Sequence, residues 1–322
     1  MLITCYLSPV FFFRYARLYV LLVDCHFCCR FCSRQFFECS RGPVDYSDIS
    51  DECLRFLRLV GYARCVIFYL ILSFIFGSAV GSFLNVVIDR TVRGEGIVGR
   101  SYCDHCRATL STLDLIPIFS FVALGARCRY CKKALSWQYP VVEGLTALLF
   151  TIAFYSLVIM GDLNLITLIF YFLTISVGIV VAVVDFKFSL VPTTLVYAAA
   201  LITLFYNFFF LDLPVFVENV LAAFILALIF LLIVVLSRGR GMGQGDIVLV
   251  FWIGLVLGYK EAFVAMFLAF SVGAVVSLAL IAARKKHFGQ TIPFAPFLIL
   301  GFFTSLFYSQ QIIDWYLKFV YR

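Results

Sequence analysis

The sequence predicts an all-α polytopic membrane protein with about eight transmembrane helices and a cytoplasmic zinc-ribbon-like loop between the first two. Its composition is the first reason, because 64% of the 322 residues are hydrophobic and only 13% are charged. Apolar residues also fill whole windows, each near the length of about 20 residues that a helical span needs, instead of alternating with polar ones. The third reason is one polar loop that contains two closely spaced cysteine pairs.

Eight segments qualify as candidate membrane helices. In chain order they are 67–88, 141–160, 164–184, 193–211, 217–236, 247–258, 262–283 and 293–310. The sixth is short and contains Gly254 and Gly258, so we expect it to be tilted or partly enclosed by protein. Residues 140–310 then make a seven-helix membrane domain after the first span at 66–88, and 311–322 form a C-terminal tail.

Residues 1–65 differ from the rest of the chain. They contain eight of the twelve cysteines and eight arginines but no lysine. These cysteines lack the separated pairs that a metal site needs, and the stretch does not have the uninterrupted apolar core of a signal peptide. We interpret it as an extension outside the main fold, or as upstream translation ahead of a functional start near Val66.

The loops predict the orientation in the membrane. Basic residues concentrate in alternate loops, namely 89–139, 185–191, 237–246 and 284–290. The positive-inside rule places these four loops in the cytoplasm. This asymmetry accounts for most of the net charge of +7, so the charge gives no reason to predict a nucleic-acid partner.

The loop 89–139 contains two Cys-x2-Cys pairs. Cys103 and Cys106 form the first, and Cys128 and Cys131 form the second. Two such turns can complete a tetrahedral four-thiolate shell, which is typical of structural zinc. A full shell leaves no open position for substrate, and we interpret His105 as a bystander. A disulfide is the weaker interpretation in the reducing cytoplasm.

Two aspartates end long apolar runs on the predicted cytoplasmic side. Asp185 closes the third predicted span, and Asp246 follows two glycines, Gly243 and Gly245, that open the sixth. A carboxylate at a membrane boundary is costly unless it has a partner or a task. Two of them facing each other would make an aspartyl protease pair, with unequal helix-end environments that favour Asp185 as the proton holder and Asp246 as the base.

Simpler interpretations of the aspartates remain open at this point. Each could cap a helix, or pair with a basic residue nearby in sequence, Lys187 or Arg240. As a different class of function, the pair could also bind protons or cations in a membrane transporter or binding protein.

Several segments together resemble one known family. In order they are Gly81–Ile88, the four cysteines, Tyr139–Thr146, Asp185 with Val191-Pro192, Gly243-x-Gly245-Asp246, and Ile292–Phe297. This chain resembles the prepilin peptidases, or type IV leader peptidases, from about residue 70 to 308. Gly-x-Gly-Asp alone also occurs in presenilin-like intramembrane proteases, which remain a rival, but the ordered set with the cysteine loop is specific.

The resemblance implies a bifunctional enzyme of the bacterial inner membrane with its active site facing the cytoplasm. It would cleave the leader of prepilins or pseudopilins after a Gly and then N-methylate the new terminus with S-adenosylmethionine. Asp185 and Asp246 become the catalytic pair, and the methyl-transfer site falls within 81–143. Glu143 could serve that site or only pair with a basic loop residue.

Two positions depart from the family pattern. Thr193 stands where the family commonly has Asp or Asn, and Val248 stands where it commonly has Lys. A missing Lys would remove a cation near Asp246, so we expect substrate preference or rate to differ while the pair itself is retained.

Overall fold

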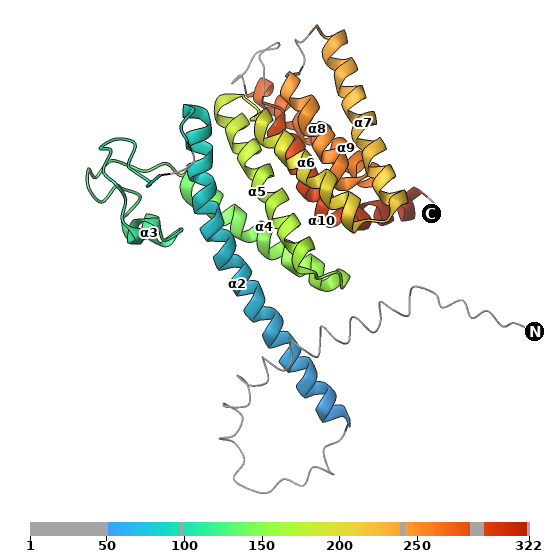
Figure 1. The fold of residues 1–322 in the computed structure, drawn as a ribbon, viewed down its shortest axis with the longest axis horizontal. Coiled ribbons are helices and arrows are strands. Elements are labelled where there is room, and N and C mark those ends of the chain that lie inside the picture. Colours follow the sequence, from blue (N-terminus) through green and yellow to red (C-terminus); the bar gives the residue numbers. More distant parts are fainter. Residues whose placement is uncertain (1–50, 97–98, 239–241, 284–292, 321–322) are drawn as a thin grey trace, which may run out of the picture. The chain divides into compact units, whose positions relative to one another are not determined.

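The computed structural model describes residues 51–96, 99–238, 242–283 and 293–320. Within these ranges the chain forms helices joined by turns and by one long loop (Figure 1). It divides into two compact units, residues 1–72 and 73–322, and the sites below lie in the second. Residues 1–50, which carry most of the predicted extension, lie outside the described part, so that interpretation stays a prediction.

The helices follow in chain order. They are α2 (Asp51–Arg93), the 3-10 turn η2 (Thr112–Leu115), α3 (Phe119–Ala123), α4 (Gln138–Met160), α5 (Leu165–Phe188), α6 (Thr193–Phe210), α7 (Leu213–Leu236), α8 (Gln244–Leu257), α9 (Tyr259–Ala282) and α10 (Ala295–Val320). Each of the eight predicted apolar segments coincides with one of the long helices.

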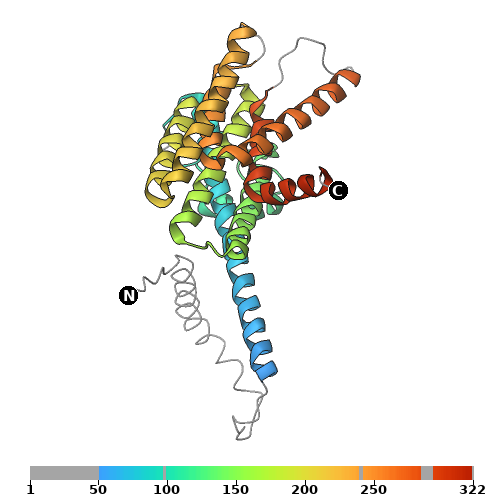
Figure 2. The same cartoon turned by 90° about the vertical axis from the view of Figure 1, so that its right-hand side faces the viewer.

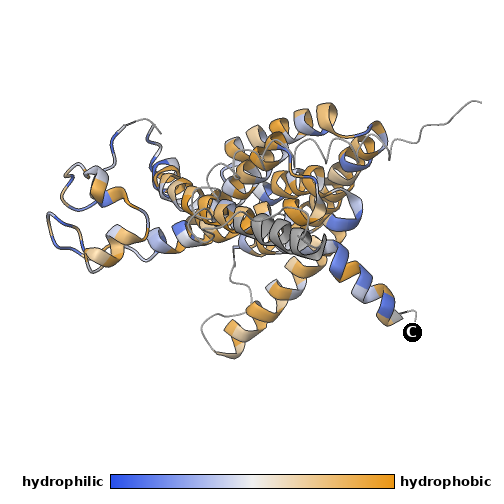
Figure 3. Ribbon diagram, turned by 90° about the horizontal axis from the view of Figure 1, so that it is seen from below, coloured by the Kyte–Doolittle hydropathy of each residue, from blue (hydrophilic) through white to orange (hydrophobic). Residues whose placement is uncertain are grey.

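Seven helices of the described chain are long and apolar enough to cross a membrane. The eighth, α8, has 14 residues, fewer than the roughly 20 that a full span needs. Its Leu249, Val250, Trp252 and Ile253 are fully buried. The sixth predicted segment is therefore a helix enclosed by protein, as its length and glycines indicated. In Figure 3 apolar colour dominates the helices, whereas hydrophilic colour gathers in the cysteine loop and near the C-terminal end of α10.

The predicted helix ends needed three corrections. The first predicted segment, 67–88, is part of a longer helix that runs from Asp51 to Arg93. Residues 259–261, which the predicted segments leave as a turn between 247–258 and 262–283, are already helical, because Gly258, with φ of 77°, makes the turn alone. The predicted tail at 311–322 continues α10 as far as Val320, since this stretch contains no Gly or Pro to end the helix.

Two buried apolar cores hold the second unit together. The larger surrounds α8 and takes residues from α5, α6, α7, α9 and α10. The smaller joins the last turns of α2 to α4, α5 and α10. α9 packs against α10, and α7 packs against α8 (Figures 1 and 2). Helix α5 belongs to both cores, so the residues at its end lie where the two meet.

Candidate active site

Asp185 lies in the last turn of α5. The turn is closed by Ser189, which adopts a left-handed conformation and donates its N–H to the backbone oxygen of Asp185 over 2.8 Å. The Asp185 side chain is only 5% exposed. Its Oδ2 accepts the N–H of Ala295, the first residue of α10, at 3.1 Å. The carboxylate at the C-terminal end of its own helix therefore faces the N-terminal end of another.

Asp246 is the third residue of α8 and is 6% exposed. Its Oδ2 accepts the N–H of Gly243 at 3.2 Å, which satisfies one of the N–H groups that a helix start leaves unpaired. Gly245 allows close packing here, because a Cβ at this position would lie 2.7 Å from the Cβ of Val191 in the α5–α6 connection. The start of α8 thus packs directly against the chain that follows Asp185.

The two carboxylates interact electrostatically across this contact. Lys187 does not neutralise Asp185, because its ammonium binds the side-chain oxygen of Gln138 and lies 3.9 Å from Asp89. The interpretation of Asp185 as a simple partner of Lys187 was therefore wrong. Arg240, the other basic residue considered, lies outside the described residues.

The helix-polarity argument also needs correction. It assumed that only Asp246 meets a helix N-terminus, yet Asp185 accepts an N–H from the start of α10. Both carboxylates therefore have one backbone donor from a helix start, and the ground for favouring Asp185 as the proton holder disappears. The expectation that Asp185 ends one helix while Asp246 opens another is confirmed.

The four loop cysteines converge. Their sulfur atoms all lie within 4.8 Å of one another, and the Sγ atoms of Cys103 and Cys131 are 3.9 Å apart. A tetrahedral site with Zn–S bonds near 2.3 Å requires sulfur–sulfur distances of about 3.8 Å. The sequence prediction that these four residues form one cluster is confirmed, and the cluster is compatible with a structural metal.

The two cysteine turns have the same local structure. In the first, Arg107 donates its N–H to the oxygen of Cys103, and in the second Lys132 donates to the oxygen of Cys128. Arg107 and Lys132 both have positive φ, 56° and 58°. Backbone N–H groups of Cys131 and Tyr130 donate to the Cys128 sulfur and, against the effect of burial, lower its pKa to about 7. A thiolate, the form that binds metal, is thereby favoured.

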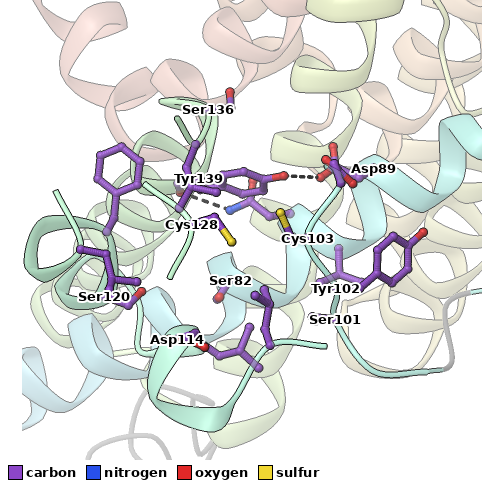
Figure 4. Close-up of a pocket in the computed structure, with 18 of the residues that line it drawn as sticks. Ser82, Asp89, Ser101, Tyr102, Cys103, Asp114, Ser120, Cys128, Ser136 and Tyr139 are labelled. Atoms are coloured by element: carbon purple, nitrogen blue, oxygen red, sulfur yellow. Dashed lines mark hydrogen bonds between the residues drawn. The ribbon is translucent and has the colours of Figure 1, made fainter. Parts of the chain in front are cut away.

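A cavity of about 420 Å³ lies between the end of α2, the start of α4 and the cysteine loop. Figure 4 shows Cys103 and Cys128 together at its centre, with Tyr139 bound to Asp89. The Tyr139 hydroxyl donates to Asp89 over 3.1 Å, and Asn85 donates to the Tyr139 carbonyl over 3.2 Å. Asn85 and Tyr139 entered the sequence prediction only within segments that carry the family resemblance, and no individual role was assigned to them or to Asp89. Asn85 and Asp89 are four apart and so share one helix face, a signal that could have revealed them.

Glu143 also lines this cavity, from the first turns of α4. Its Oε2 accepts the N–H of Ile118 at 2.7 Å, and the Ser82 hydroxyl is a second partner. The suggestion that Glu143 pairs with a basic loop residue was wrong for the described residues, because none of the ion pairs found there includes it.

The two departures from the family pattern occupy different environments. Thr193 is the first residue of α6, directly after Pro192. Val248 is partly buried and packs against the larger core around α8. An apolar side chain suits that position, and it supplies no charge to Asp246, two residues before it.

Comparison with known proteins assigns the family. Residues 75–157 match the model described as Bacterial Peptidase A24 N-terminal domain, and residues 172–278 match the Type IV leader peptidase family. A Bacillus subtilis (strain 168) protein named prepilin leader peptidase/N-methyltransferase is 33% identical over 253 residues, covering 76% of this chain and 96% of the relative. An Aeromonas hydrophila protein of the same name is 30% identical over 277 residues, covering 77% and 94%.

No solved structure matches this chain significantly. The family matches begin in the second half of α2 and reach α9, so they include both aspartates and the four cysteines. The similarity to the two curated relatives extends over nearly their whole length. With seven membrane-length helices, this chain is a multi-pass membrane protein that belongs to the type IV leader peptidase family.

Proposed function

We propose that this protein cleaves the leader of type IV prepilins and pseudopilins after a Gly, with Asp185 and Asp246 as its catalytic pair, and then methylates the new N-terminal amine. The observation that carries the first step is the meeting of two buried, interacting carboxylates from α5 and α8. The curated relatives are named for both activities. The same names argue against an ion transporter or a presenilin-type enzyme.

The geometry suits acid–base catalysis by two carboxyl groups that share one proton. Two like charges that repel each other disfavour double ionisation, so one group stays protonated. The ionised carboxylate takes a proton from water as the oxygen attacks the peptide carbonyl, and the protonated one donates to the carbonyl oxygen. As the tetrahedral intermediate collapses, the carboxyl that took the proton from water gives it to the amide nitrogen, and the C–N bond breaks to release the amine of the new N-terminus. The N–H groups of Ala295 and Gly243 hold the two carboxylates in place.

The cysteine loop would bind one zinc ion through Cys103, Cys106, Cys128 and Cys131. With all four positions filled by thiolates, the ion would stabilise the loop and take no part in the chemistry. S-adenosylmethionine would supply the methyl group. The positive-inside rule supports a cytoplasmic location for both sites. Of the four predicted cytoplasmic loops, 89–139 borders the cavity, 185–191 begins at Asp185, and 237–246 ends at Asp246.

A cleavage assay tests the proposed function. Membranes that contain the full chain are incubated with a prepilin, and the trimmed product and its N-terminal methylation are followed by mass spectrometry. Wild type should trim at the Gly-Phe junction. Asp185→Asn and Asp246→Asn should each reduce trimming by at least about a hundredfold, since each removes one acid–base group.

Asp162→Asn is a matched control, because it changes an exposed carboxylate in the turn between α4 and α5. It should trim like wild type at equal protein levels. Trimming that survives either Asp185→Asn or Asp246→Asn would contradict the assignment of the pair. Wild-type protein that trims no prepilin would refute the proposed function itself.

A further inference from the structure

The cavity beside the cysteine loop contains one carboxylate without a cation. Arg93 pairs with Asp104 at 2.7 Å and Arg129 with Asp114 at 2.6 Å. The guanidinium of Arg90, which also lines the cavity, donates to the backbone oxygens of Gly96, Gly99 and Arg100. Asp89 has Lys187 at 3.9 Å. Among the described residues, Glu143 has no such partner. A buried negative charge without a cation is costly, so this cavity is suited to receive a positively charged group.

The loop holds the Glu143 carboxylate in a fixed position through a strained backbone turn at Ile118. The carboxylate is 7% exposed and accepts the Ile118 N–H at 2.7 Å. Ile118 has φ of 60° and ψ of −50°, and the next N–H, that of Phe119, bonds to the oxygen of Pro117. This is a γ-turn with positive φ, which is rare and strained for a β-branched residue. Strain of this kind clusters at functional sites, and here it directs an N–H at Glu143.

The cavity is also linked to the proposed peptidase site. Lys187, two residues after Asp185, binds both Gln138 and Asp89. Gln138 in turn donates to Asn85 at 3.2 Å, and Asn85 and Asp89 both line the cavity. One chain of polar contacts therefore runs from the last turn of α5 to the cavity wall. These contacts connect the residue two positions after Asp185 with groups that line the cavity.

We propose that Glu143 binds the α-ammonium group of the cleaved substrate in this cavity and removes its proton before methyl transfer. The proposal rests on the proposed function and assigns one residue of its second step. The ammonium transfers a proton to the Glu143 carboxylate, which leaves a free amine. The nitrogen lone pair then forms the new N–CH₃ bond while the S–CH₃ bond of S-adenosylmethionine breaks and its electrons return to sulfur. Products are S-adenosylhomocysteine and a methylated ammonium, and the proton on Glu143 passes to water.

The sulfonium of S-adenosylmethionine is a second possible cation, and binding measurements separate the two. Purified full-length protein is titrated with a labelled peptide that begins with Phe and carries no leader, either with a free amine or N-acetylated. Wild type should bind the free amine more than about tenfold tighter, as expected for a hydrogen bond between buried charged groups. The variant Glu143→Gln should bind both peptides equally, with its affinity for S-adenosylmethionine unchanged.

The same variant should methylate the peptide more than about tenfold slower while still trimming prepilin. The substituted amide can still accept the Ile118 N–H, so the loop keeps its support. Glu143→Asp retains the charge and should retain the preference for the free amine. Glu261→Gln is the matched control, because it makes the same change where Glu261 contacts Gln310, outside the cavity.

Four outcomes would overturn the proposal. Three concern Glu143→Gln: it methylates the peptide at the wild-type rate, it still prefers the free amine, or it selectively loses binding of S-adenosylmethionine. The fourth is that Glu143→Asp loses the preference for the free amine. Wild-type protein that trims but never methylates would remove the second half of the proposed function as well. If Glu143→Gln still trims prepilin, its peptidase activity is intact, and each of these results then concerns the methylation step alone.

Discussion

The aspartate pair and the cavity beside the cysteine loop are built in different ways. Asp185 and Asp246 lie on two helices that share a dry core, and each carboxylate is held by a backbone N–H at the start of a helix. The cavity has one wall of helix and one wall of loop, and the loop depends on two short turns, four cysteines and a few ion pairs. Helix packing thus positions the first site. The second site needs a cross-link such as the cysteine cluster, because its loop has little apolar core of its own.

This difference predicts that the two activities can be separated. Changes in the loop should affect methylation and spare trimming, and changes where the start of α8 packs against the α5–α6 connection should do the reverse. The cores of the two sites share α5, so the separation is sharpest for residues remote from that helix.

Of the three changes that test this separation, loss of one cysteine ligand should have the largest effect. Cys103→Ser removes a buried sulfur ligand from the four-cysteine cluster. The protein should therefore lose the zinc proposed above, and the cavity wall should lose its fixed shape. Methylation should fall by more than about tenfold with trimming retained. Metal content by mass spectrometry and the two product assays on one membrane preparation would check this, with Cys65→Ser as the control outside the cluster. A Cys103→Ser protein that loses both activities equally would contradict the separation.

Gly245→Ala should produce the opposite pattern with a smaller effect. The added Cβ would lie 2.7 Å from Val191, so α8 must shift away from the α5–α6 connection that follows Asp185. Overpacking of this kind costs about 1–3 kcal/mol, and trimming should slow by about tenfold while a leaderless peptide is methylated normally. Gly273→Ala is the control, since its Cβ would meet Phe294 at an ordinary 3.5 Å. Equal rates for both variants would show that this contact does not position the pair.

Asp114→Asn should have the smallest effect. Hydrogen bonds from Ser111 and Arg129 keep the pKa of Asp114 below its ordinary value although burial acts against them. Because the folded-state pKa is lowered, this stabilisation is complete above the unfolded pKa of about 3.9 and disappears as pH falls through the folded value. Arg129 is half exposed, so solvent limits the effect to about 1 kcal/mol or less.

Limited proteolysis of the loop provides the measurement for Asp114. At pH 7 the Asp114→Asn loop should be cut somewhat faster than the wild-type loop. With a protease active in acid, the difference should start to shrink as pH drops below about 4 and should disappear once pH falls below the lowered pKa of the wild-type carboxyl. A difference that stays constant with pH would mean that the charge of Asp114 does not stabilise the loop.

Much of this molecule could be predicted from local sequence. Long apolar runs fix where membrane helices occur, because a span must satisfy its own backbone hydrogen bonds. The spacing of Cys103, Cys106, Cys128 and Cys131 is likewise a local property of two turns, and the structure brings their sulfur atoms together. Helix ends were harder, because Gly258 turns the chain in a single residue and α10 has no signal that stops it near residue 310.

Local sequence did not predict which groups contact the functional side chains. Asp185 takes its backbone donor from Ala295, Lys187 binds Gln138 and Asp89, and Glu143 receives the N–H of Ile118. Each of these contacts joins segments far apart in the chain, and the wrong expectations for Asp185 and Glu143 came from assigning partners nearby in sequence. Hydropathy and spacing alone determined the membrane fold, the two aspartates and the cysteine cluster. Only helix packing decided which groups surround each carboxylate, since a buried charge depends on whatever the tertiary structure places beside it.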